Sequence, residues 1–194
     1  MDVWERYWTK PRRLLNLCRI IFNVLYVRRI KKFTAHSLIL EVGCGTGSCS
    51  QLLRGEGYET VGVDISPTAC KVSKKRVGNV ILADGRSLPF RDKTFSLCFS
   101  QGLIEHFSSE DEKWLIKEMS RTSCMIVLSV PKFRGLLHIV HRLFNLIHVK
   151  WIFPDEHYYS RGELERTLRD FSSIHWTEGF LFMDLIGFMI PENS

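Results

Sequence analysis

The chain has 194 residues, a formal net charge of +6, 45% hydrophobic residues and 25% charged residues. This length supports one domain with a full hydrophobic core and leaves little room for a second. The composition excludes a disordered chain and a fibrous protein. We therefore expect residues 1–194 to form a single folded domain.

The basic charge is concentrated in residues 1–36, which we interpret as a helical extension. This segment holds nine Lys and Arg residues and only two acidic ones, whereas the remainder is nearly neutral. Residues 12–30 are mostly apolar with a narrow polar stripe that includes Asn23, which predicts a helix that is largely covered. A solvated helix face is the simpler interpretation of the charge, and peripheral contact with an anionic membrane, nucleic acid or acidic substrate is the alternative.

From residue 38 the pattern changes to short apolar runs that alternate with helical segments. The runs that predict strands are residues 38–42, 60–63, 80–82, 95–99 and 125–128. Helices are expected from the glycine turn to about residue 54, from Pro67 with Ser66 as its cap, and over residues 111–119. Apolar runs without polar alternation are buried on both faces, so they predict a parallel sheet with helices on both sides. We assign residues 38–131 to this core.

The alternation is interrupted after the fifth strand. Residues 132–158 form an insertion in which residues 134–149 have the pattern of an amphipathic helix, and we interpret it as a lid over the substrate. Ser160 and Glu163 then form a capping box that opens a helix through residue 169. Two closing strands are expected over residues 171–176 and 180–188, within a C-terminal part that covers residues 159–194. The prediction is a Rossmann-like, doubly wound α/β fold with a mostly parallel seven-stranded sheet.

The six cysteines do not indicate a metal site. None of them forms a C-x-x-C pair, and no cysteine and histidine cluster has zinc spacing. The apolar stretch near the N-terminus is broken by polar residues and is too short to span a bilayer. We expect a protein without a metal, in a reduced cytoplasmic location.

The most informative residues are Glu41, Gly43, Gly45 and Gly47, directly after the first strand. Glycines let the backbone turn tightly and approach a ligand, and the turn opens a helix at the sheet edge where doubly wound folds bind ligands. The loop lacks the Lys of a P-loop, and its third glycine comes one residue earlier than in the dinucleotide fingerprint. A carboxylate two residues before the loop suits a cationic ligand and repels a pyrophosphate.

The segment from Leu40 to Gly47 resembles motif I of the class I S-adenosylmethionine-dependent methyltransferases. The resemblance is strongest to the small-molecule branch that includes the ubiquinone and menaquinone biosynthesis methyltransferases, and it covers residues 38–131 well. It implies that the glycine loop lies under the methionine moiety and that Glu41 helps to hold its ammonium group. The residues that it assigns to the S-adenosyl-L-methionine site are Glu41, Gly43, Cys44, Gly45, Gly47, Asp64, Ile65, Asp84, Gly85 and Gln101.

The resemblance also gives individual roles to the two aspartates. Asp64, which we expect at an exposed strand end, takes the ribose hydroxyls, and Asp84 accepts from the adenine amino group beside Gly85. Both aspartates could instead be simple turn or helix caps. Glu41 could likewise cap the helix that follows the loop.

The implied reaction is transfer of the methyl group to a small, apolar or aromatic acceptor by in-line displacement, with S-adenosyl-L-homocysteine as product. His106 is the candidate general base, although a histidine in such a place more often orients a loop. His106, His157, Tyr158 and Tyr159 are the candidate substrate contacts, and the alternative for the tyrosines is that they cover the sheet edge. A methyltransferase acting on RNA or protein, and a non-catalytic S-adenosylmethionine-binding protein, stay open as alternatives.

Overall fold

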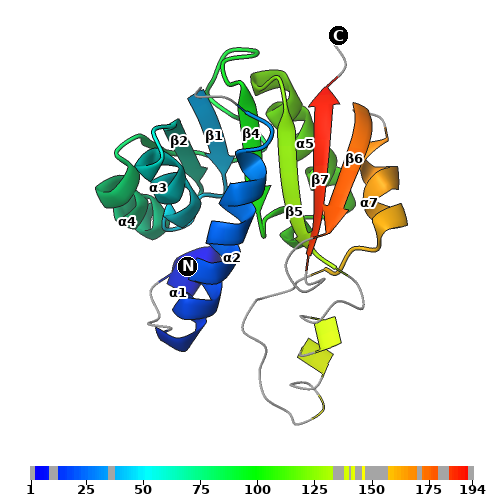
Figure 1. Ribbon diagram of the computed structural model, residues 1–194, viewed down its shortest axis with the longest axis horizontal. Coiled ribbons are helices and arrows are strands. Elements are labelled where there is room, and N and C mark those ends of the chain that lie inside the picture. The colour runs from blue at the N-terminus through cyan, green and yellow to red at the C-terminus, as the bar shows by residue number, and fades with distance from the viewer. Residues whose placement is uncertain are drawn as a thin grey trace.

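The computed structural model describes residues 3–8, 13–34, 38–132, 138–139, 141–142, 146, 157–169, 172–178 and 184–191. A seven-stranded sheet in the order β3-β2-β1-β4-β5-β7-β6 forms its centre (Figure 1). The strands are β1 (Leu38–Val42), β2 (Glu59–Asp64), β3 (Val80–Leu82), β4 (Leu97–Gln101), β5 (Ile126–Pro131), β6 (Ser172–Glu178) and β7 (Asp184–Pro191). The first five strands pair in parallel, and β7 pairs antiparallel with β5 and β6. The predicted mostly parallel, doubly wound α/β fold is confirmed.

The helices lie where the sequence predicts them, with two additions. They are α1 (Val3–Trp8), α2 (Arg13–Ile30), α3 (Ser48–Gly55), α4 (Pro67–Val77), the 3-10 helix η1 (Ile104–His106), α5 (Ser109–Thr122) and α7 (Arg161–Leu168). The Ser66 side chain accepts from the Ala69 N–H at 3.2 Å, and Ser160 with Glu163 forms the expected capping box. The additions are η1, with three residues, and α1, with six, and both are too short for an apolar periodicity to stand out.

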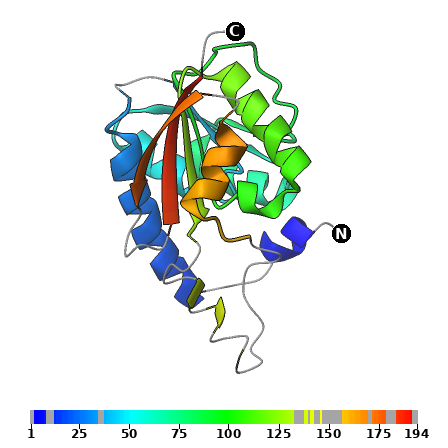
Figure 2. The same ribbon diagram turned by 90° about the vertical axis from the view of Figure 1, so that its right-hand side faces the viewer.

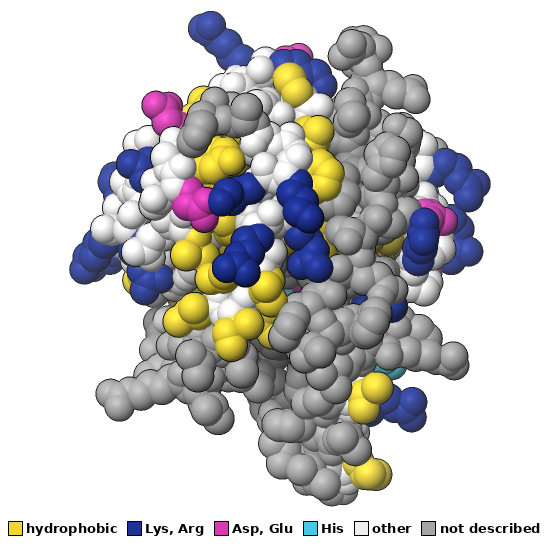
Figure 3. All heavy atoms as spheres, in the orientation of Figure 1, with side chains coloured by type: hydrophobic (Ala, Val, Ile, Leu, Met, Phe, Trp, Pro, Cys, Tyr) yellow, Lys and Arg dark blue, Asp and Glu magenta, His cyan; other side chains and the backbone are white. Residues whose placement is uncertain are grey.

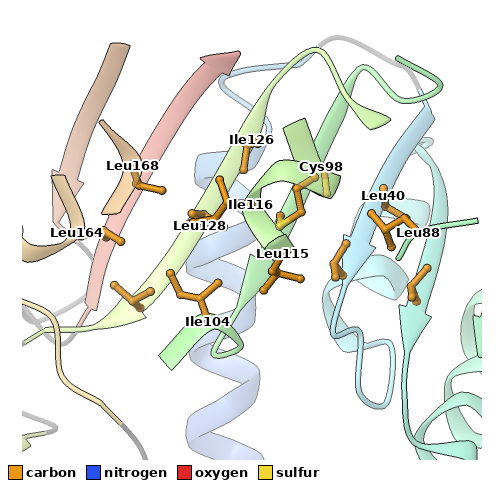
Figure 4. Packing of buried hydrophobic residues seen from close by; sticks show 14 of the residues in the cluster. Leu40, Leu88, Cys98, Ile104, Leu115, Ile116, Ile126, Leu128, Leu164 and Leu168 are labelled. Atoms are coloured by element: carbon orange, nitrogen blue, oxygen red, sulfur yellow. The ribbon is translucent and has the colours of Figure 1, made fainter. Parts of the chain in front are cut away.

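Two hydrophobic clusters fix the helices to opposite faces of the sheet (Figure 2). On one face, α5 and α7 contribute Leu115, Ile116 and Leu164, which share one cluster with Leu128 of β5 (Figure 4). Between β3 and β4 the structure has a loop, and its Leu88 fills the same cluster. Because both faces are covered, the ends of the strands are where polar chemistry can be placed.

On the other face, the C-terminal half of α2 belongs to the core. Its Tyr26, Val27 and Ile30 are buried together with α3 and the central strands. Asn23, expected on the polar stripe, is also buried, whereas Ile20 is exposed, so the covered face of the helix differs from the predicted one. The helix covers the sheet because its apolar side chains gain more by packing there than by facing water.

The predicted lid helix over residues 134–149 lies mostly outside the described residues. The positions that are described within it, residues 138, 139, 141, 142 and 146, are helical. Among the helices that the structure describes, none combines the length and the apolar character that crossing a bilayer requires.

The contact of Tyr26 with two strands provides a test of the packing of α2. Its hydroxyl donates to the backbone oxygen of Ser100 at 2.8 Å and lies 3.2 Å from that of Val127. Tyr26→Phe should lower the free energy of unfolding by about 1–2 kcal/mol, because a buried hydrogen bond is lost. Denaturant unfolding followed by circular dichroism measures this.

The matched control is Tyr58→Phe, in which the lost bond to the Thr34 oxygen is longer, at 3.4 Å, and only partly buried. This variant should lose about 0.5 kcal/mol or less. Equal losses in the two variants would contradict a specific role of Tyr26 in fixing α2.

Candidate functional site

The glycine loop between β1 and α3 has backbone conformations that favour glycine. The φ angles are 70° at Gly43, 51° at Gly45 and 72° at Gly47. A Cβ atom at Gly43 would lie 2.8 Å from Leu103, and one at Gly47 would lie 2.3 Å from the Ser73 hydroxyl oxygen. Glycine is therefore required here both by the turn and by the side chains packed on it.

Glu41 is buried at the end of β1, with an exposed fraction of 5%. Its carboxylate accepts from the Ser50 N–H at 3.0 Å and from the Ser50 hydroxyl, so it caps the first turn of α3. Burial raises the pKa of Glu41 to about 7, which the Ser50 hydrogen bonds offset in part and the charge of Asp64 increases. Of the two uses that the sequence left open for Glu41, the helix cap is present.

Asp64 is buried at the end of β2, with an exposed fraction of 8%, and this corrects the expectation of an exposed strand end. One carboxylate oxygen accepts from the Gly45 N–H at 2.7 Å and the other accepts from the Ser66 N–H at 2.9 Å. The same side chain thereby closes the glycine loop and orders the start of α4. Truncation of Asp64 would therefore cost stability as well as any ligand contact.

Two buried carboxyl groups lie at one sheet edge, and their ionised forms give this site a negative potential, to which Glu41, with a pKa of about 7, contributes in part at neutral pH. Such a site fits a ligand that carries a cationic group and hydroxyl donors, and it disfavours a pyrophosphate. Ile65, next to Asp64, is 46% exposed and provides apolar surface beside the carboxylates. The residues present therefore fit S-adenosylmethionine, which has an ammonium group, a sulfonium and a ribose diol.

The remaining predicted cofactor residues are spread along the same edge. The Asp84 carboxylate is paired with the Arg86 guanidinium, with 2.7 Å between Oδ2 and Nη2, and this holds the pKa of Asp84 below its usual value. A Cβ at Gly85 would lie 2.7 Å from Leu115, so Gly85 also allows close packing. Gln101, at the end of β4, accepts from the Cys49 thiol at 3.2 Å.

Cys44, within the glycine loop, is buried. Its thiol lies 3.8 Å from the Ser73 hydroxyl oxygen. Burial, together with the charges of Glu41 and Asp64, raises the pKa of the Cys44 thiol far above its ordinary value. The Cys44 side chain is therefore a neutral packing group beneath the loop and not a nucleophile.

His106 lies in η1, just after β4, and packs edge-on against Trp4 with 4.7 Å between ring centroids. The segment that precedes α7 is bound to the same place, because the His157 N–H donates to the Glu105 backbone oxygen at 3.2 Å. Tyr158 contacts two histidines of the insertion, and its hydroxyl lies 2.9 Å from Nδ1 of His141. Aromatic side chains from three distant segments thus gather at one edge of the sheet.

Tyr159 departs from the expected substrate contact. It is 2% exposed, and its hydroxyl donates to the Glu112 carboxylate of α5. Burial raises the pKa of Glu112, and the same burial raises that of the phenol. Tyr159 therefore fastens the segment before α7 to α5, and its hydroxyl is engaged by Glu112.

Sequence reasoning missed the three side chains of α1 that reach this edge, namely Trp4, Glu5 and Trp8. Glu5 accepts from the Ser66 hydroxyl at 2.5 Å, and a Cβ at Gly45 would lie 2.6 Å from the Trp8 ring. The signal in the sequence was the spacing of Trp4 and Trp8, which places both on one face of a helix.

Comparisons with known proteins relate part of the chain to one family. Residues 40–123 match the family model described as methyltransferase domain. The chain is 36% identical over 78 residues to the 18S rRNA (guanine-N(7))-methyltransferase of Bos taurus, a match that covers 39% of this chain and 28% of that protein. It is 35% identical over 89 residues to the malonyl-[acyl-carrier protein] O-methyltransferase of Hamiltonella defensa, covering 45% of this chain and 34% of that protein. The chain thus spans about a third or less of the length of these relatives.

Two solved structures share the fold. The PH0226 protein of Pyrococcus horikoshii OT3 has a TM-score of 0.73 at 20% identity, and the alignment covers 91% of each chain. The magnesium protoporphyrin IX methyltransferase of Synechocystis PCC 6803, solved with bound S-adenosylhomocysteine, has a TM-score of 0.66 at 16% identity, covering 97% of this chain and 93% of that one. At these identities the likeness extends to the fold alone.

The raised pKa of Glu41 predicts a pH dependence of stability. The folded protein holds the Glu41 proton more tightly than the unfolded chain, whose carboxyl has the ordinary pKa of 4.5. The free energy of unfolding should therefore fall as the pH rises from about 4.5 to about 7, by up to about 3 kcal/mol from this group. Glu41→Gln retains an acceptor for Ser50 and cannot ionise, so this part of the pH dependence should disappear.

Urea unfolding at pH 5, 6, 7 and 8 measures the effect as the difference between the wild-type and Glu41→Gln curves. The control is Glu59→Gln, which changes an exposed carboxylate at the start of β2. Wild-type and Glu41→Gln curves that run parallel across this range would show that Glu41 is ionised throughout.

Proposed function

We propose that this protein, whose residues 40–123 match the methyltransferase domain family, is a class I S-adenosylmethionine-dependent methyltransferase that transfers a methyl group to a small, apolar or aromatic acceptor. When bound, S-adenosylmethionine supplies an electrophilic methyl carbon on a sulfonium. The observation that carries the proposal is the pair of buried carboxylates, Glu41 and Asp64, on either side of the glycine loop. This arrangement suits a ligand with an ammonium group and a ribose diol.

The chain's own residues have separate tasks in this proposal. Glu41 attracts the ammonium group, and the loop of Gly43, Cys44, Gly45 and Gly47 lets the methionine portion approach the backbone. At the next strand ends, Asp64 accepts from the ribose and Ile65 lies against the adenosine. Asp84, beside Gly85, accepts from the adenine amino group. Gln101 lies beside the reactive end of the cofactor.

The chemical demand on the protein is mainly alignment. Holding the nucleophile in line with the methyl carbon supplies ~7–11 kcal/mol in favourable cases. A general base is needed only if the acceptor must lose a proton near neutral pH. His106 is the candidate for that role, because it lies just after β4 at the same edge, packed on Trp4.

The preference for a small aromatic or apolar acceptor is supported by the residues around His106. Trp4 and the backbone of His157 each contact the segment of His106, and Tyr158 contacts two histidines of the insertion. Aromatic side chains offer planar apolar surface and few charged groups, which favours a ligand of the same kind. The similarity to a malonyl-[acyl-carrier protein] O-methyltransferase shows that the relatives are not restricted to enzymes named for RNA acceptors.

The second candidate is an RNA acceptor. It is favoured by the similarity to the 18S rRNA (guanine-N(7))-methyltransferase and by the basic side chains over the C-terminal part of α2 (Figure 3). Arg28 and Lys32 are exposed there, while Lys31 pairs with Glu56. Basic surface of this kind binds phosphates without reading sequence, so it indicates a class of partner and no specific site.

Calorimetry tests the cofactor. S-adenosylmethionine and S-adenosylhomocysteine should each bind with one site per chain, and NAD should not bind, because two carboxylates repel its pyrophosphate. Binding of NAD without a response to either adenosyl ligand would overturn the proposal. Transfer of a labelled methyl group to hydrophobic aromatic acceptors, compared with ribosomal and transfer RNA, then separates the two acceptor classes.

Asp64→Asn tests the ribose role. The variant keeps the shape of the side chain, but its amide group cannot accept from both the Gly45 and the Ser66 N–H groups. The free energy of unfolding should fall by about 1–3 kcal/mol. Affinity for S-adenosylhomocysteine should fall roughly 10- to 150-fold, because a hydrogen bond to a charged acceptor contributes ~1.5–3 kcal/mol.

The control for this variant is Asp92→Asn, in which the altered side chain is exposed and pairs with Arg121. It should retain both stability and affinity. Full affinity in a folded Asp64→Asn protein would show that Asp64 is only a structural cap.

A further inference from the structure

The glycine loop is packed from three directions by side chains of the protein itself. The Cα of Gly43 faces Leu103 beyond β4, that of Gly47 faces Ser73 of α4, and that of Gly45 faces Trp8 of α1. In each case a Cβ on the glycine would lie 2.8 Å or less from the packed side chain. Trp8 therefore packs on the loop as closely as Leu103 and Ser73 do. Its contact with Gly45 helps to fix the conformation of the loop.

Glu5, one turn before Trp8, binds α1 to a second element. Its carboxylate accepts from the Ser66 hydroxyl at 2.5 Å, from the Thr68 N–H at 3.3 Å and from the Thr68 hydroxyl. These donors are at the N-terminus of α4, where the helix dipole favours a negative charge. The hydrogen bonds to Ser66 and Thr68 hold the pKa of Glu5 below its usual value, so this carboxylate is ionised at neutral pH.

Ser66 connects Glu5 to the site already described. Its hydroxyl donates to Glu5, and its backbone N–H donates to Asp64. Ser66, just after β2, thus donates to both carboxylates and keeps them close together. The ribose of the proposed cofactor has two hydroxyl groups, and each needs an acceptor. Trp4, one turn before Trp8 on the same face of α1, packs on His106 of η1.

From these contacts we propose that α1 forms one wall of the cofactor site, with Trp8 against the methionine portion of S-adenosylmethionine and Glu5 beside its ribose. This inference rests on the proposed function. The wall adds aromatic surface over Gly45 and a further negative charge beside Asp64. Both features strengthen binding of a cationic adenosyl ligand, since aromatic faces attract cations and buried apolar surface excludes water.

The test measures the affinities for S-adenosylmethionine and S-adenosylhomocysteine by calorimetry in the 194-residue chain. Trp8→Ala should weaken binding by about tenfold or more, which corresponds to ~1.4 kcal/mol, and Glu5→Gln should weaken it by about threefold or more. Trp114→Ala is the matched control, because Trp114 is 51% exposed on α5 and contacts Lys117. It should bind as the wild type does.

Trp8→Phe provides a second readout. It keeps an aromatic ring at this position, so the variant should fold even if Trp8→Ala does not. It keeps a ring over Gly45, so its affinity should stay within about threefold of the wild type. The change in tryptophan fluorescence on adding S-adenosylhomocysteine should shrink in Trp8→Phe and stay unchanged in Trp114→Phe.

Wild-type affinity in Trp8→Ala, or an unchanged fluorescence response in Trp8→Phe, would overturn the wall. Tighter binding by Trp8→Ala would also overturn it, because Trp8 would then compete with the ligand for the same space. A wild-type protein that binds neither adenosyl ligand would refute the proposed function itself, so the two failures are distinguishable.

Discussion

The Asp64 carboxylate is the interaction on which the candidate site depends. It ends β2, and its two oxygens accept from backbone N–H groups of Gly45 and Ser66, which belong to different turns. Hydrogen bonds to an ionised acceptor are stronger than neutral ones, and a buried position removes competing water. One side chain thereby fixes the glycine loop after β1 relative to the start of α4. Because β1 and β2 are parallel neighbours, both turns lie at the same edge of the sheet.

Two further carboxyl groups lie near Asp64, and each is hydrogen-bonded at the N-terminus of a helix. Glu41 accepts from Ser50 in the first turn of α3, and Glu5 accepts from Thr68 in the first turn of α4. The N-terminal turn of a helix provides N–H donors and a favourable dipole for an anion. Burial nevertheless raises the pKa of Glu41 to about 7, since those donors only partly replace water. A cationic ligand would lower this cost, which links the fold of the site to the kind of ligand that it favours.

The two hydrophobic clusters explain why this chemistry stays at the edge. Residues of α5 and α7 cover one face of the sheet, while α2 and α3 cover the other, so the strand interiors are dry. A rigid sheet presents its carboxyl ends, and the loops that follow them carry the polar side chains. Tyr26 shows that α2 belongs to this scaffold, because its buried hydroxyl reaches the backbone of two strands. The extension that the sequence marked by its charge is therefore in part a core helix.

The sequence by itself determined the central strands, the longer helices and the glycine loop, because these depend on local patterns. Apolar runs, the Ser66 cap and the capping box at Ser160 involve residues a few positions apart, and the structure has each of them. The partners of the site residues were decided by the tertiary structure. Glu5 and Ser66 are 61 residues apart, and Tyr159 and Glu112 are 47 residues apart. No local period specifies such pairs, since they form only when the sheet and its helices bring distant turns to the same edge.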